Sequence, residues 1–223
     1  LLVGILLGAF LGFLNSMVLI SCGALTQAEA LFITYGMSAV YSAIALIYTG
    51  GATQHMTWLT TPQTVFTAIG SGTVGIFSVS FIIFLACLFL LWVFHNKTYS
   101  GRSISYTGGN KVAAELSGIP IKRSVILIYT ICGLMSAVGA VVLFSRITTA
   151  APIIGKNYET NAILSVVVGG TTLKGGKGSV LRTVLGVLLI TLMSNCMNLL
   201  GVSAYLQVVL KGAILVLAIW LDN

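Results

Sequence analysis

Six long apolar runs constrain this chain more than any other feature of its sequence. Each is about 20 residues long, which is the length that an α-helix needs to cross the hydrocarbon core of a bilayer. Transmembrane β-strands would instead alternate apolar and polar residues over roughly ten positions. We therefore predict an all-α protein, a polytopic bundle of about six transmembrane helices. The predicted spans are Leu1–Ile20, Ala30–Thr49, Ile76–Phe94, Ser124–Phe144, Val180–Leu200 and Ser203–Leu221.

Two further segments predict short or broken helices. Asn161–Val168 is apolar but too short to span a membrane alone, so it either begins earlier, near Pro152, or forms a half-helix or re-entrant segment. Thr64–Val74 is rich in Gly, Thr and Ser and predicts a short helix along one side of the bundle. We find no Pro-rich linker, and we expect residues 1–223 to form one transmembrane domain.

The composition predicts that lipid surrounds much of this chain. Of its 223 residues 57% are hydrophobic and 7% are charged, whereas a soluble domain carries about a quarter charged residues. The net charge of +7 is explained by topology and not by nucleic acid, because basic residues concentrate in cytoplasmic loops of membrane proteins. One such loop is predicted between the third and fourth spans, where a single acid, Glu115, accompanies Lys97, Arg102, Lys111, Lys122 and Arg123.

The sequence offers little for catalysis, a metal or a cofactor. Ser71 with His55 as its base is a formal candidate for an intramembrane hydrolase, but no Gly-x-Ser-x-Gly elbow or orienting carboxylate accompanies them. The four cysteines have no CxxC spacing. The glycine-rich run from Gly169 to Ser179 lacks the contiguous Gly-Lys-Ser/Thr of a phosphate-binding loop, and it predicts a tight cytoplasmic turn with close helix approach. We expect no catalytic residue, no metal site and no cofactor.

Small and polar residues within the spans have two interpretations each. Gly4, Gly8 and Gly12 recur every four residues, a spacing that lets helices approach closely, either within the chain or across a dimer. Asn195, Asn198, Gln207 and Lys211 lie in or beside the last two spans, where polar groups are costly unless they are paired or face a cavity. They either form hydrogen bonds between helices, with Lys211 reaching toward the interface, or line a translocation path.

Three motifs, in order, resemble the permease subunits of bacterial ribose- and other monosaccharide-type ABC importers. Residues 108–119 (GGNKVAAELSGI) resemble the family's GGN-x-x-AA-x-x-SGI loop. Tyr158-Glu159, Ala162 and residues 168–178 (VGGTTLKGGKG) resemble its YE…A…VVLGGTSL-x-GG-x-G segment. Residues 198–207 (NLLGVSAYLQ), with Lys211-Gly212, are similar to its C-terminal end.

The resemblance implies a multi-pass subunit of the bacterial cytoplasmic (inner) membrane that translocates a monosaccharide or similar small polar solute. Its expected partners are a cytoplasmic ATP-binding subunit, a periplasmic or lipid-anchored sugar-binding protein, and a second permease that is identical or a paralogue. ATP hydrolysis is expected in the partner, and the chain is expected to lack the family's N-terminal helices. The alternative is a gradient-driven secondary transporter or channel. The implied coupling loop to the ATPase comprises Gly109, Asn110, Ala113, Ala114, Ser117 and Gly118, and Asn110 is expected to cap its short helix.

Overall fold

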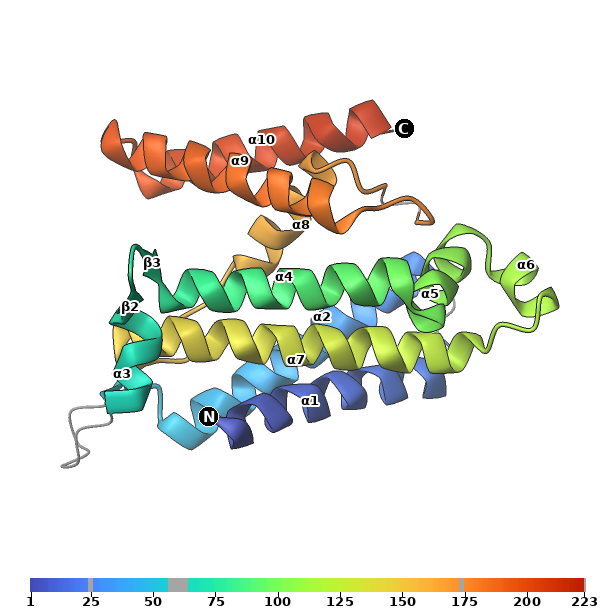
Figure 1. The fold of residues 1–223 in the computed structure, drawn as a ribbon, viewed down its shortest axis with the longest axis horizontal. Helices are drawn as coiled ribbons and strands as arrows, with labels where there is room; N and C mark the ends of the chain where they lie inside the picture. The colour runs from blue at the N-terminus through green and yellow to red at the C-terminus, as the bar shows by residue number, and fades with distance from the viewer. Residues whose placement is uncertain (24–25, 56–63, 173–174, 223) are drawn as a thin grey trace. The chain divides into compact units, whose positions relative to one another are not determined.

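The computed structural model describes residues 1–23, 26–55, 64–172 and 175–222, most of which lie in helices (Figure 1). The predicted all-α class is confirmed. Leu173 and Lys174 of the glycine-rich run lie outside the described residues. The helices are α1 (Leu2–Ser21), α2 (Gln27–Thr49), α3 (Thr64–Ser71), α4 (Val79–Lys97), α5 (Tyr99–Gly109), α6 (Lys111–Leu116), α7 (Ile121–Ile147), α8 (Tyr158–Val168), α9 (Val180–Leu199) and α10 (Ala204–Asp222).

Five of the described helices, α1, α2, α4, α7 and α9, are long and apolar enough to cross a membrane. The sixth predicted span corresponds to α10, whose apolar stretch Ala204–Trp220 is shorter. Large apolar side chains on these helices, among them Leu2, Phe32 and Ile47, are exposed on the isolated chain. Such exposure is unfavourable in water and suits a surface that lipid covers.

Two helices extend three residues beyond their predicted spans, α2 at its start and α7 at both ends, whereas short strands shorten the third span at its start. The third span begins at Val79 and not at Ile76, because β2 (Thr73–Val74) and β3 (Phe77–Ser78) form a tight antiparallel hairpin before it. Gly75 has a φ of 64°, which a two-residue hairpin turn requires and which glycine adopts readily. A second pair joins β1 (Gln54–His55) to β4 (Thr149–Ala150).

The chain divides into two compact units. One contains Leu1–Phe89 and Lys122–Ile154, and the other contains Leu90–Ile121 and Gly155–Asn223. The first unit holds α1, α2, α3 and α7, and the second holds α5, α6, α8, α9 and α10. The expectation of one transmembrane domain stays a prediction.

In the first unit, α1 packs against α7 through glycines. A Cβ on Gly8 would overlap Ala137 Cβ and lie 2.8 Å from the Gly133 carbonyl oxygen, and a Cβ on Gly12 would overlap the Tyr129 carbonyl oxygen. Backbones this close leave no room for a side chain. The interpretation of these glycines as packing within the chain is confirmed for Gly8 and Gly12, whereas Gly4 has open space around it.

The predicted short segments are both helices. The helix expected within Thr64–Val74 is α3, and its Phe66 ring lies 5.3 Å from that of Phe144 on α7. The helix expected near Asn161–Val168 begins at Tyr158, and its 11 residues span about 16 Å, too short to cross a bilayer alone. It packs against α9 and α10 (Figure 1). At Gly186 of α9 a Cβ would overlap the Ser165 carbonyl oxygen, so this crossing also depends on glycine.

Candidate functional site

The predicted coupling loop folds into a sharp corner between two short helices, α5 and α6. Asn110 is at once the C-cap of α5 and the N-cap of α6, with extended backbone (φ −155°, ψ 107°). Its side-chain oxygen accepts a hydrogen bond of 3.0 Å from the backbone N–H of Ala113. This bond satisfies one of the unpaired donors at the start of α6. The prediction that Asn110 caps this helix is confirmed.

The other end of α6 is closed by a Schellman motif. The N–H of Gly118 donates to the Glu115 carbonyl at 2.9 Å, and the N–H of Ile119 donates to the Ala114 carbonyl at 3.0 Å. Gly118 has a φ of 76°, the left-handed conformation that this motif needs at that position. The Ser117 hydroxyl also donates to the Ala113 carbonyl at 2.8 Å. The motif residues of the loop therefore define both ends of α6.

The side chains of α6 divide into one that is buried and several that are not. Ala114 is 4% exposed and packs inside the chain. By contrast, Val112 is 67% exposed and Leu116 is 86% exposed, and Ala113 is also exposed. Val112 and Leu116 are four residues apart, so they lie on the same face of the helix. The sequence did not lead us to predict this exposed apolar face, although two large apolar residues four positions apart in a basic loop could have indicated it.

The glycine-rich run packs against the end of α5. A Cβ on Gly176 would lie 2.6 Å from Gly109 Cα, and a Cβ on Gly108 would lie 3.2 Å from the Gly176 nitrogen. A Cβ on Gly175 would overlap the Gly108 carbonyl oxygen. We call these four residues, Gly108, Gly109, Gly175 and Gly176, the glycine contact. It confirms the close approach expected from this run.

Of the predicted path residues, the structure brings two together. Gln207 of α10 is 9% exposed, and its side-chain amide donates hydrogen bonds to Asn198 Oδ1 at 2.8 Å and to the Val202 carbonyl at 3.0 Å. These bonds close the turn between α9 and α10. Asn195 is exposed and Lys211 half-buried, and neither side chain makes a hydrogen bond or ion pair within the described part of the chain.

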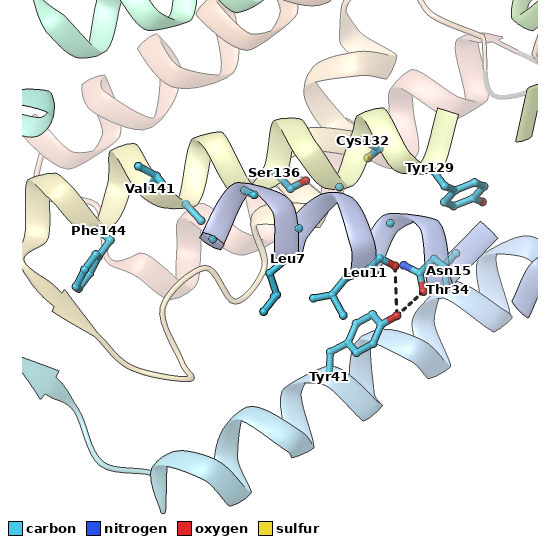
Figure 2. Close-up of a pocket in the computed structure, with 16 residues that line it drawn as sticks. Leu7, Leu11, Asn15, Thr34, Tyr41, Tyr129, Cys132, Ser136, Val141 and Phe144 are labelled. Atoms are coloured by element: carbon cyan, nitrogen blue, oxygen red, sulfur yellow. Dashed lines mark hydrogen bonds between the residues drawn. The ribbon is translucent and has the colours of Figure 1, made fainter. Parts of the chain in front are cut away.

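A cavity in the first unit gathers polar groups that the sequence reasoning did not single out. Its volume is about 750 Å³, and α1, α2 and α7 line it (Figure 2). The Tyr41 hydroxyl points at α1, 3.3 Å from Asn15 Oδ1 and 3.4 Å from the Leu11 carbonyl oxygen. Ser136 of α7 also lines the cavity. Asn15 within an apolar run was the available signal, as it was for Asn195 and Asn198.

The two residues considered for catalysis lie in different elements. His55 lies in β1 and Ser71 at the C-terminal end of α3. Each of the four cysteines is a free thiol. No three His, Cys, Asp or Glu side chains gather where they could hold a metal ion among residues 1–23, 26–55, 64–172 and 175–222.

The known proteins that this chain matches include permeases of transport systems. A family model described as the permease component of branched-chain amino acid transport systems matches residues 1–219. The chain is 39% identical over 190 residues to the ribose import permease of Bacillus subtilis (strain 168), covering 85% of this chain and 58% of that protein. It is 34% identical over 221 residues to the ribose import permease of Escherichia coli (strain K12), covering 97% of this chain and 66% of that protein.

A third relative is the L-arabinose transport system permease of Escherichia coli (strain K12), 40% identical over 139 residues. This match covers 62% of the chain and 42% of that protein. The chain thus spans less than two thirds of the length of these relatives. No solved structure gives a significant match to it.

Proposed function

Since the chain belongs to the family of permease components of branched-chain amino acid transport systems, we propose that it is the membrane subunit of an ATP-driven ABC importer. It is a multi-pass protein of the bacterial cytoplasmic (inner) membrane, with five helices of span length. The solute is a monosaccharide or a similar small polar molecule. Support for a sugar comes from the relatives, which are named for ribose and L-arabinose import.

The observation that carries this proposal is the exposed apolar face of α6. The helix lies in the most basic loop of the chain, on the cytoplasmic side by the positive-inside rule. An apolar face that water surrounds is unfavourable, and such patches mark surfaces that bind other proteins. Val112 and Leu116, with Ala113 between them, therefore form the docking surface for the cytoplasmic ATP-binding subunit. Burying side chains of this size contributes about 1.5–3 kcal/mol each.

The six predicted coupling residues divide into two roles under this proposal. Ala113 and Ser117 are exposed and touch the partner. Asn110 and Gly118 fix the ends of α6, Gly109 belongs to the glycine contact, and Ala114 anchors the helix to its own chain. An arginine at Ala114 would therefore test folding and not docking.

The proposed translocation path includes Asn195 and Lys211. Each is a polar side chain on a largely apolar helix without a hydrogen-bond or ion-pair partner in the described residues, and such groups are costly in lipid unless they face a wet cavity. Asn198 and Gln207 bond to each other, which supports a structural role for this pair at one end of the path.

The chain itself performs no catalysis in this proposal. ATP hydrolysis takes place in the cytoplasmic subunit, a sugar-binding protein outside the membrane delivers the solute, and a second permease, identical or a paralogue, completes the path. The competing function is a gradient-driven transporter, which would couple solute movement to an ion and would need no docking surface on α6.

Co-purification tests the proposal. The complete permease is co-expressed with its ATP-binding subunit, and retention of that subunit is measured for Val112→Glu plus Leu116→Glu. Both side chains are exposed, so the fold is retained and the expected loss of retention is at least tenfold. Lys111→Glu is the matched control, because it introduces the same residue at an exposed site of α6 and is expected to stay within twofold of the natural sequence. Unchanged retention in the double variant would refute the docking surface. Uptake that collapses with the ion gradient but not with ATP depletion would favour the alternative.

A further inference from the structure

The glycine contact joins two segments that are far apart in the sequence. Gly108 and Gly109 are the last residues of α5, and Gly175 and Gly176 lie between α8 and α9. The contact is backbone against backbone, with no side chain between the two segments. Gly109 directly precedes Asn110, the N-cap of α6. The proposed docking helix therefore begins two residues after this contact.

The glycines are required for two separate physical reasons. Gly175 and Gly176 have φ values of 86° and 77°, which other residues adopt only with strain. In addition, a Cβ at Gly176 would lie 2.6 Å from Gly109 Cα, a distance at which the backbone must shift. Gly170 has only the first of these two requirements, because its φ is 80° and nothing lies within 4 Å of its added Cβ. Gly176 therefore needs to be glycine for its contact with α5 as well as for its backbone conformation.

Hydrogen bonds hold the segment that carries Gly175 and Gly176. The Thr172 hydroxyl donates to the Gly175 carbonyl at 3.1 Å, and the Thr172 N–H donates to the Lys177 carbonyl at 3.2 Å. The Thr171 N–H donates to Val166 of α8 at 3.2 Å. Where α8 meets α9, a Cβ on Gly169 would lie 2.6 Å from the Arg182 carbonyl oxygen. These bonds and contacts tie the turn to both helices.

We infer that the glycine contact couples α6 to α8 and α9, so that movement of the docking helix displaces the helix pair that ends in the Asn198–Gln207 turn. Because the two backbones touch directly, no side chain can rotate to absorb a displacement of one of them. The displacement is therefore passed on to the other backbone, as in other closely packed interiors. The four glycines are positioning residues: they touch neither ATP nor solute. The inference rests on the proposed function, since it takes α6 as the surface that the ATP-binding subunit moves.

Hydrogen exchange of the purified permease tests the contact without any partner. The amides of Ala114, Ser117 and Ile119 are hydrogen-bonded in or at the end of α6 and report on its anchoring. In Gly176→Ala their exchange is expected to accelerate at least tenfold. In Gly170→Ala, which carries the same φ strain without the clash, it is expected to stay within twofold. Equal exchange in the two variants would overturn the inference.

Two further variants serve as a control and as a milder perturbation. Gly109→Ala places its Cβ at 3.6 Å from Gly176 Cα, an ordinary contact, and is expected to behave as the natural sequence. Gly108→Ala meets the Gly176 nitrogen at 3.2 Å, so it serves as the milder perturbation if Gly176→Ala does not fold. Accelerated exchange in Gly108→Ala but not in Gly109→Ala supports the contact, and no difference between them argues against it.

The complete importer tests the coupling. In Gly176→Ala the ATP-binding subunit is expected to co-purify normally while solute-stimulated ATP hydrolysis falls at least tenfold relative to Gly170→Ala. Normal co-purification with undiminished stimulation would overturn the inference and leave the proposed function standing. Failure of the subunit to co-purify even with the natural sequence would refute the proposed function, and with it the coupling that the inference assigns to the contact.

Discussion

Alanine at Gly133 is expected to destabilise the chain, whereas alanine at Gly139, six residues further along α7, is expected to stabilise it. A Cβ at Gly133 would overlap the Gly8 carbonyl oxygen and lie 2.9 Å from Gly12 Cα and 3.0 Å from the Gly12 nitrogen. All three neighbours are backbone atoms of α1, so no rotamer change relieves the overlap and the helices must separate. At Gly139 nothing lies within 4 Å of the added methyl.

The magnitudes follow from two terms of opposite sign. Alanine is favoured over glycine within a helix by about 1 kcal/mol at both positions. Overpacking costs about 1–3 kcal/mol, and a backbone clash belongs to the upper part of that range, about 2–3 kcal/mol. Gly133→Ala should therefore lose about 1–2 kcal/mol and Gly139→Ala should gain about 1 kcal/mol. At roughly 2–4 °C per kcal/mol for a chain of this size, the expected changes in Tm are about −2 to −8 °C and about +2 to +4 °C.

Thermal unfolding of the two variants in one detergent, followed by the loss of the monodisperse peak, measures this difference. The helix-propensity term cancels between the variants, so the gap between their Tm values reports the packing of α1 on α7 alone. A rise in Tm for Gly133→Ala as large as that for Gly139→Ala would refute the close contact between these helices.

Three further predictions concern the second unit. Asn110→Ala removes the cap of α6 and should cost about 1 kcal/mol, which would make hydrogen exchange at Ala114 roughly fivefold faster. Asn110→Ser should retain most of the protection, because serine also caps helices. Equal exchange in both variants would contradict the capping role. Gly118→Ala forces alanine to φ 76° and should cost about 1–2 kcal/mol in the stability of α6 by the same measurement, and an unchanged rate would exclude the Schellman motif. Gln207→Leu and Asn198→Leu should be non-additive by about 0.6–1.7 kcal/mol in thermal unfolding, because each removes the same 2.8 Å hydrogen bond, and strict additivity would show that the pair does not interact.

Much of the fold was predictable because lipid imposes simple rules on a sequence. Apolar runs located the spans, and the Gly8 and Gly12 spacing located a packing face. The hairpin before α4 was missed because Ile76 and Phe77 are as apolar as the helix that follows, so hydropathy could not place the boundary. Only Gly75 marked the turn.

The candidate site was predictable where chemistry is local and not where it depends on distant contacts. Asn110 was assigned as a cap because capping needs only a polar side chain at a helix start. The burial of Ala114 beside the exposed Ala113 was not, since it depends on which face of α6 meets the rest of the chain. The glycine contact was not predictable either, because Gly109 and Gly176 are far apart in the sequence and no periodicity links them.

The packing of α1 on α7 also has a consequence for biosynthesis. The glycine face of α1 finds its partner about 120 residues later in the chain, at Gly133. Ribosomes add about 5–20 residues per second, so α1 is synthesised roughly 6–24 s before that partner. During that interval its Gly8 and Gly12 face meets lipid, other nascent helices or the insertion machinery. Depleting a membrane chaperone should therefore affect this chain most while α2 to α7 are still being made.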